Sequence, residues 1–310
     1  MTGPHPKLEA LAERCASLPP LPTAIVHPCD IPSLDGALRA AEAGLIAPIL
    51  VGPQARIRAT ALAAGLELGT WTIIDTPHSH ASAERAVALV REGGAAALMK
   101  GSLHTDELMA AVVAKEGGLR TARRVSHVFV MDVPTYPKLL LITDAAVNIL
   151  PSLEDKADIV ANAIELAQAL GIVTPKVAIL SAVETVTAKL PSTIEAAALC
   201  KMAERGQIKG GLLDGPLAFD NAISKDAART KGIESEVAGD ADILLVPDLE
   251  AGNMLAKTLT FLGGADAGGI VLGARVPIVL TSRADSAAAR MASCAIAVLM
   301  ANRKKDSSFF

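Results

Sequence analysis

The chain has 310 residues, of which 51% are hydrophobic and 20% charged, with a formal net charge of −4. At roughly 150 residues per domain this length predicts two domains, and a chain this apolar buries a core that excludes intrinsic disorder. The mildly negative charge and an aromatic content of 2% argue against nucleic-acid binding, which relies on a basic face or on stacking aromatics.

The sequence also argues against a membrane or secreted protein. No apolar run reaches the ~18 residues of a membrane-spanning helix, and the longest run, at residues 291–301, is typical of a buried helix. Residues 1–15 carry charges and lack an apolar segment, so no signal peptide is expected. The four cysteines form no C-x-x-C pair, which predicts neither a zinc site nor a disulfide framework. We therefore expect a cytoplasmic protein.

Short β-rich apolar runs alternate with alanine-rich helical stretches along the chain. The predicted strands are residues 23–27, 48–51, 71–75, 95–99, 127–133, 139–143, 177–180, 211–213, 243–246, 270–272 and 277–280. The predicted helices are residues 33–43, 54–64, 82–91, 105–115, 154–170, 193–205, 221–231, 251–262 and 284–300. This alternation predicts parallel sheets with right-handed crossovers, and hence an α/β fold.

Some local signals refine this order. The runs at 127–133 and 139–143 are close enough to form an antiparallel pair. Ser192 and Glu195 have the spacing of a capping box, and Gly171 and Gly206 are placed to end the helices before them. The long helix at 154–170 is expected to lead into the second domain.

Ligands of open α/β sheets bind beyond the carboxyl ends of the strands, so polar strand-to-helix junctions are candidate sites. The first such junction follows the strand at 95–99. Gly101 lets the backbone approach a ligand, Ser102 and Thr105 can donate to an anion at a helix N-terminus, and Lys100 adds positive charge. In the structural alternative Thr105 is only a helix cap and Lys100 is a solvated residue.

A second junction precedes the last helix. Ser282, Arg283 and Asp285 there form a candidate cluster for binding an anion and handling a proton. The structural alternative is a capping arrangement in which Asp285 complements the helix dipole and pairs with Arg283.

Two further junctions contain Asp214 and Asn253. Asp214 opens an Asp-Gly-Pro turn signal. The segment 252–258 resembles a truncated phosphate-binding loop, but the glycine before its lysine is missing, which excludes a P-loop NTPase. His27 and His127 fall at strand positions and are interpreted as structural residues, and no His/Asp/Glu cluster has the spacing of a metal site.

Six motifs in order resemble the phosphate acetyltransferase and phosphate butyryltransferase family over about residues 24–300. They are residues 100–105, 126–134, 143–148, 214–220, 247–253 and 282–283. The sequence at residues 100–105 and 132–136 is similar to that of the butyryl branch and of the acyltransferase half of bifunctional enoyl-CoA hydratase proteins.

The resemblance implies two α/β domains flanking a cleft, as in the isocitrate and isopropylmalate dehydrogenases. Residues 1–148 with 274–310 would form domain I, and residues 149–273 domain II. It also implies a homodimer, acyl-CoA and phosphate as substrates, and reversible transfer of a short acyl group, acetyl to butyryl, with no metal or cofactor. Chain-length preference and physiological direction stay open.

The resemblance further implies roles for the junction residues. Ser282 would donate a hydrogen bond at the reacting centre and Arg283 would clamp phosphate. Ala289 occupies the position of an aspartate that is catalytic in the acetyl branch, so the general base stays unassigned. Asp285 or His104 could supply it, or the thiolate of coenzyme A forms without a base from the enzyme. The residues implied to bind substrate are Lys100, Ser102, His104, Thr105, Asp214 and Asn253.

Two other functions remain as alternatives to this enzyme. The first is a catalytically silent acyl-CoA-binding or regulatory homologue, which the departure at Ala289 keeps open. The second is a metal-dependent dehydrogenase on the related fold, against which the missing aspartate cluster argues.

Overall fold

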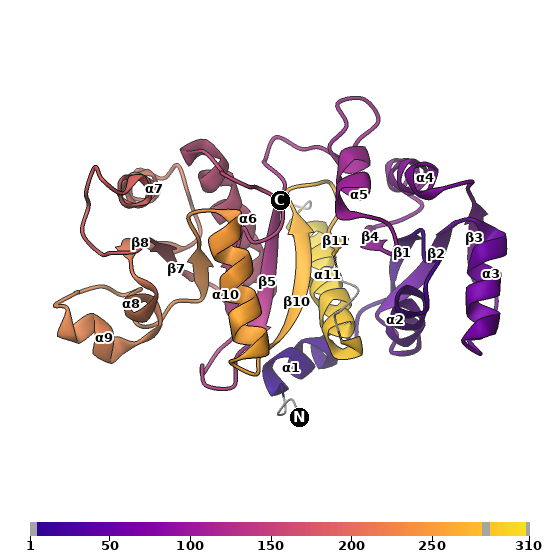
Figure 1. Ribbon diagram of the computed structural model, residues 1–310, viewed down its shortest axis with the longest axis horizontal. Coiled ribbons are helices and arrows are strands. Elements are labelled where there is room, and N and C mark those ends of the chain that lie inside the picture. Colours follow the sequence, from indigo (N-terminus) through magenta and orange to yellow (C-terminus); the bar gives the residue numbers. More distant parts are fainter. Residues whose placement is uncertain (1–4, 281–285, 308–310) are drawn as a thin grey trace. The chain divides into compact units, whose positions relative to one another are not determined.

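The computed structural model describes residues 5–280 and 286–307, and the chain divides into two compact units (Figure 1). Unit 1 contains Ser126–Ala267 and the described residues up to Lys7, and unit 2 contains Leu8–Val125 and the described residues from Gly268 onward. The division therefore falls before residue 126, whereas the sequence analysis expected it after residue 148. Its physical reason is strand pairing, because the two strands between these positions pair within unit 1.

The strands of unit 2 follow one another in the order β3-β2-β1-β4-β11-β10. Neighbours are parallel from β3 to β11, and β11 and β10 are antiparallel. The bounds are β1 Leu21–Val26, β2 Ile46–Gly52, β3 Thr72–Asp75, β4 Ala97–Lys100, β10 Asp266–Leu272 and β11 Ile278–Val279. Ile25, Leu98 and Met99 on the central strands have no exposed surface, as expected for parallel strands covered on both faces.

The helices of unit 2 connect these strands. Helix α2 contacts α11, and α4 contacts β1, β2 and α5. The bounds are α2 Ile31–Glu42, α3 Gln54–Ala63, α4 Ser79–Arg91, α5 Thr105–Val112 and α11 Ala287–Ser307, and α1 (Pro6–Arg14) spans the division between the units. Because β1, β2, β3 and β4 are parallel, their carboxyl ends lie at one edge of the sheet. Helices α2, α3, α4 and α5 each follow one of these ends and so begin at that edge.

Unit 1 has the strand order β5-β6-β9-β7-β8. Strands β5 and β6 are antiparallel, as predicted, and the other pairs are parallel. The bounds are β5 Ser126–Asp132, β6 Leu140–Thr143, β7 Lys176–Leu180, β8 Leu212–Leu217 and β9 Ile243–Leu245.

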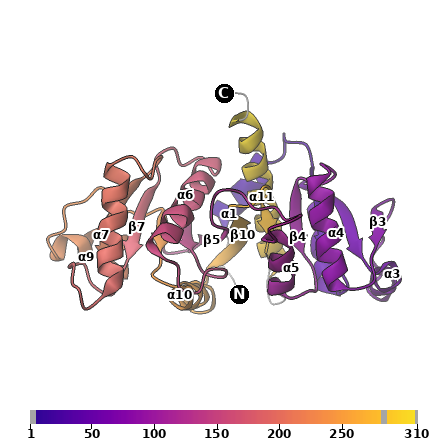
Figure 2. The same cartoon turned by 90° about the horizontal axis from the view of Figure 1, so that it is seen from above.

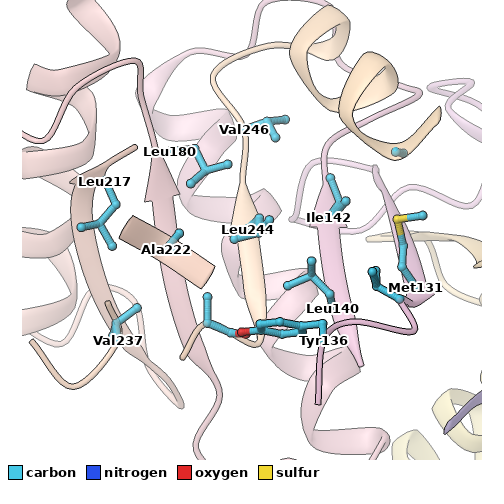
Figure 3. Packing of buried hydrophobic residues seen from close by; sticks show 14 of the residues in the cluster. Met131, Tyr136, Leu140, Ile142, Leu180, Leu217, Ala222, Val237, Leu244 and Val246 are labelled. Atoms are coloured by element: carbon cyan, nitrogen blue, oxygen red, sulfur yellow. The ribbon is translucent and has the colours of Figure 1, made fainter. Parts of the chain in front are cut away.

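Helices cover both faces of the unit 1 strands. Figure 2 shows α6 and α7 on one side of these strands and α10 on the other. The side chains under α10 form one apolar cluster, in which Tyr136, Leu140 and Leu244 pack together (Figure 3). The buried Tyr136 hydroxyl donates to the Ala241 carbonyl at 2.6 Å. The bounds are α6 Leu153–Ala169, α7 Pro191–Glu204, α8 Phe219–Ile223, α9 Lys225–Thr230 and α10 Leu249–Phe261.

All eleven predicted strands are present, but several helix predictions need correction. Helix α1 was not predicted, and the helix expected at 221–231 is two helices, because Ser224 has extended backbone and caps α9. Gly171 and Gly206 end their helices with positive φ, as predicted. None of the helices in the described ranges combines the length and the apolar composition needed to cross a membrane.

The capping box predicted for α7 is wrong. That helix begins two residues earlier, with Pro191 at its first position and Leu190 as its N-cap, a placement that suits the fixed φ of proline. Ser192 instead hydrogen-bonds the Ser181 hydroxyl, and Glu195 pairs with Lys156. A capping box does occur at the start of α6.

Candidate active site

Unit 2 has a topological switch point between β1 and β4. The chain runs outward from β1 to β2 and β3 and then returns to β4 on the other side of β1. In open α/β sheets, ligands bind at the carboxyl ends of the two strands that flank such a point. Here β1 ends next to His27 and β4 ends at Lys100, and Val26 pairs with Lys100 across the two strands. The first junction selected from the sequence therefore lies at the position that the fold favours for a ligand.

The loop after β4 is held against the end of β1 by its glycine and serine. The Gly101 N–H donates to the Val26 carbonyl at 2.9 Å. A Cβ at Gly101 would lie 2.4 Å from that oxygen and 2.7 Å from the His27 carbonyl oxygen, so only glycine fits. Ser102 Oγ donates to the His27 carbonyl at 2.9 Å and accepts from the Cys29 N–H at 3.2 Å. The loop and the end of β1 thus form one hydrogen-bonded structure.

The loop after β4 places the positive charge of Lys100 near the N-terminus of helix α5. Lys100 is buried with 8% exposure, and its Nζ donates to the Leu103 carbonyl at 3.1 Å. His104 is exposed and is the N-cap of α5, and Thr105 is the first helical residue. The structural alternative for Thr105, a helix cap, is therefore wrong by one position. A lysine beside the N-terminus of a helix suits an anionic ligand.

Glu107 lies in the first turn of α5, where its carboxylate accepts hydrogen bonds. Its carboxylate accepts hydrogen bonds from the Ser79 side chain and the His104 backbone, and these bonds, with the Ser79 bond first, lower the pKa of Glu107. Glu107 therefore stays ionised and fixes the first turn of α5 against α4.

Unit 1 carries a second polar turn at the end of β6. The Asp144 carboxylate is buried and accepts from the backbone N–H groups of Ala146, Val147 and Asn148 and from Asn148 Nδ2, at 2.6–3.2 Å. Four donors on one carboxylate fix the turn at residues 144–148.

Helix α10 packs directly against this turn. A Cβ at Gly252 would lie 2.8 Å from the Asp144 carbonyl oxygen, so glycine permits the close approach. Asn253 Nδ2 donates to the Ala145 carbonyl at 3.3 Å. The segment 252–258 lies inside this helix, in agreement with the exclusion of a P-loop.

The structure does not bring Asp214 to the same edge. Asp214 pairs with Ala178, which pairs with Leu244, and Leu244 with Ile142. This register places Asp214 level with the interior of β6, before the turn at Asp144. Asp214 accepts a hydrogen bond from the Gly215 N–H at 2.8 Å. The turn predicted at 214–216 is part of strand β8.

His127 lies beside the Asp144 turn on β5. It is 1% exposed, its ring packs edge-on against Phe129 with 4.4 Å between ring centroids, and its Nδ1 has no hydrogen-bond partner in the described part of the chain. Burial lowers the pKa of His127 from 6.5 to about 4, against the opposing effect of Asp144. The ring is therefore neutral at neutral pH.

This shift predicts a pH-dependent stability. The unfolded chain binds a proton at His127 below pH 6.5, and the folded chain does so only below about pH 4. The free energy of unfolding should therefore be largest above pH 6.5 and fall as the pH decreases toward 4. Urea unfolding at pH 7.5, 6 and 5 should show a shallower decline for His127→Gln than for the wild type. Equal slopes would contradict the prediction, and the exposed His78, changed to Asn, is the control.

The three predicted catalytic residues, Ser282, Arg283 and Asp285, all lie outside the described residues. The helix that follows is described, and Ser286 Oγ accepts from the Ala289 N–H at 3.0 Å. Ala289 is 6% exposed. Within the described ranges, no group of three or more His, Cys, Asp or Glu side chains is placed to hold a metal ion.

The chain is similar to known proteins over most of its length. The family described as "Phosphate acetyl/butaryl transferase" matches residues 79–298. A phosphate acetyltransferase of Rhizobium meliloti is 66% identical over 299 residues, which cover 96% of this chain and 95% of that protein. A phosphate butyryltransferase of Clostridium acetobutylicum is 45% identical over 275 residues, or 89% of this chain and 91% of that protein.

Solved structures confirm the expected α/β fold. A branched-chain phosphotransacylase from Enterococcus faecalis is 32% identical, with 91% of this chain and 99% of that chain covered and a TM-score of 0.77. A 4-hydroxythreonine-4-phosphate dehydrogenase from Burkholderia phymatum, 14% identical over 92% of this chain and 99% of that chain, has a TM-score of 0.56 and shows the fold alone.

The family match and the named relatives identify the chain as an acyltransferase. The chain belongs to the phosphate acetyltransferase and phosphate butyryltransferase family, as its sequence motifs predicted. Relatives of both names match most of the chain, so the choice of acyl group is a separate question.

Proposed function

We propose that the protein transfers a short acyl group, acetyl to butyryl, reversibly between coenzyme A and inorganic phosphate. The observation that carries this proposal is the loop of residues 100–105, which lies at the switch point of a chain in this family. Its buried lysine and the start of α5 suit the phosphate that both acyl phosphate and inorganic phosphate present.

The roles proposed for the site residues are those that the family resemblance implies. Acyl transfer needs both substrates aligned and the developing oxyanion stabilised. Arg283 binds the phosphate through two parallel hydrogen bonds, Ser282 donates to the tetrahedral centre, and Asp285 takes part in proton handling. The proposed substrate contacts are Lys100, Ser102, His104 and Thr105 in unit 2 and Asn253 in unit 1, and Asp214, inside strand β8, is left out of them.

The proposal also covers the cofactor requirement, the oligomeric state and the location of the protein. The thioester and the acyl phosphate are already activated acyl donors, so the reaction needs no metal or organic cofactor. A homodimer and a cytoplasmic location complete the proposal. The exposed Phe261 and Leu262 at the end of α10 supply apolar surface that a dimer interface can bury, and light scattering of the purified chain measures its oligomeric state.

The testing experiment follows thiol release from acetyl-CoA, propionyl-CoA and butyryl-CoA, with and without phosphate and without added metal. Phosphate-dependent release is expected, and the ratio of rates identifies the preferred acyl group. Binding of coenzyme A in calorimetry with no release from any thioester would contradict the proposal and support the catalytically silent homologue.

The same assay tests the residues around Ser282. Arg283→Ala should reduce the rate more than Asp285→Ala, because the arginine binds the phosphate directly. Negligible effects of both changes would remove this segment from the site.

A further inference from the structure

His27 is a buried histidine at the switch point. It follows β1, is 5% exposed, and has φ = 54°, the one positive φ among the described residues other than glycine. Its carbonyl accepts from the Cys29 N–H at 2.8 Å, the Ser102 N–H at 3.0 Å and Ser102 Oγ at 2.9 Å. Backbone strain at a buried polar residue is found mainly at functional sites.

The hydrogen bonds around the ring determine its tautomer. Ser82 Oγ lies 2.9 Å from the His78 carbonyl, 3.1 Å from His27 Nδ1 and 2.8 Å from Thr76 Oγ1. A carbonyl only accepts, so all three contacts of Ser82 Oγ are hydrogen bonds when its one hydroxyl proton points to His78 and Oγ accepts from Thr76 Oγ1 and His27 Nδ1. A proton directed to His27 Nδ1 instead would leave only the Ser82 N–H on the His78 carbonyl. We infer the first arrangement, in which the proton of the neutral imidazole is on Nδ1 and Nε2 is unprotonated.

The surroundings keep this ring neutral and its Nε2 accessible. Burial lowers the pKa of His27, and Arg56 lowers it further. The ring's hydrogen bond within the described ranges is at Nδ1, and Nε2 is not among the buried side-chain atoms that lack a partner there, which together place Nε2 at the small exposed part of the ring. The charged and titratable groups facing the ring are Arg56 on α3, Glu107 on α5, Asp30 before α2 and His78 before α4, with Lys100 on the neighbouring β4.

We propose that His27 Nε2 is the general base that accepts the thiol proton of coenzyme A. This inference rests on the proposed acyl transfer, for which the sequence left the base unassigned. The geometry carries it, because an unprotonated nitrogen is fixed at the switch point beside the loop of residues 100–105. A general base must lie next to the proton that it removes and must be unprotonated at the working pH.

The proton balance closes over the reaction. The thiol S–H proton moves to Nε2 as sulfur attacks the acyl carbon of the acyl phosphate. The new S–C bond forms, the C–O bond to phosphate breaks, and the bond electrons leave with the phosphate oxygen. The His27 imidazolium then returns the proton to the departing phosphate, which leaves as hydrogen phosphate, and the ring is neutral again. In the opposite direction, Nε2 takes the proton from attacking hydrogen phosphate and gives it to the thiolate.

The decisive variant is His27→Asn. Asparagine tolerates positive φ well, and its amide N–H₂ can donate to Ser82 as Nδ1–H does, but it has no basic nitrogen. We expect kcat to fall by about 100-fold, a typical contribution of general acid–base catalysis. The acid side of the pH–rate profile should disappear, while coenzyme A binding in calorimetry and the circular dichroism spectrum should stay unchanged. His78→Asn, an exposed helix cap that asparagine replaces well, is the matched control and should keep the wild-type profile.

A spectroscopic measurement tests the tautomer without relying on turnover. In ¹⁵N spectra of the labelled full chain, the signal lost in His27→Asn should have a protonated Nδ1 and an unprotonated Nε2 at pH 7.5. Ser82→Ala leaves the ring in place but removes its acceptor, so it should give mixed tautomers and a smaller loss of rate than His27→Asn.

The outcomes separate this inference from the proposed function. A wild type without phosphate-dependent thiol release overturns the proposed function and the role of His27 with it. An active wild type whose His27→Asn variant keeps its rate and acid limb overturns the role of His27 alone. A ¹⁵N spectrum that shows the proton of His27 on Nε2 also overturns the role of His27 alone.

Discussion

Gly101→Ala is expected to reduce kcat/KM by about 100-fold, the cost of displacing catalytic groups by roughly 1 Å. The new Cβ would lie 2.4 Å from the Val26 carbonyl oxygen and 2.8 Å from the His27 carbonyl carbon. These atoms are backbone at the end of a central strand, so the loop with Lys100 must move instead. Steady-state kinetics with acyl-CoA and phosphate measure the loss.

The same change should reduce stability only moderately. Overpacking a tightly packed position typically costs about 1–3 kcal/mol, so the variant should still fold. Gly93→Ala is the control, since Gly93 has φ = 78° and an added Cβ there would meet no other atom within 4 Å. It should cost about 1 kcal/mol in the free energy of unfolding with unchanged kinetics. A Gly101→Ala enzyme with wild-type kcat/KM would show that the loop after β4 is not part of the active site.

The strands were predictable because their signal is local. Runs such as residues 243–246 and 270–272 are continuous and apolar, and they are buried in the structure, as strands covered on both faces must be. The antiparallel pairing of β10 with β11 was missed, since the alternation of strands and helices suggested only parallel neighbours. The division into two compact units falls earlier in the chain than the expected domain boundary, because β6 pairs with β9, about one hundred residues later, within unit 1.

The candidate site was predictable only in part. The loop of residues 100–105 has its own signal, in which a glycine and polar residues follow a strand and open a helix. His27 has no such signal, and it was interpreted as a structural residue. Its tautomer depends on Ser82 and its carbonyl on Ser102, which are 55 and 75 residues away. Sequence spacing does not show such a network, and the strand order does.

Asp144→Ala is expected to destabilise unit 1 by on the order of 3 kcal/mol. The change leaves three backbone N–H groups and Asn148 Nδ2 without their acceptor, and each unsatisfied buried donor typically costs about 1–3 kcal/mol, reduced where water enters. Urea unfolding gives the total loss. Hydrogen exchange of peptides covering residues 140–148 should localise it to the end of β6.

Two variants identify the carboxylate as the cause. Asp144→Asn keeps one oxygen acceptor and should lose less than Asp144→Ala. Asp248→Ala removes a carboxylate that accepts one helix N–H, that of Ala251, and should cost about 1 kcal/mol, as for other N-caps. Since Asn253 is bonded to the turn through the Ala145 carbonyl, loosening the turn should also reduce the rate of acyl transfer. An Asp144→Ala loss no larger than that of Asp248→Ala would mean that packing against Gly252, and not the carboxylate, holds the turn in place.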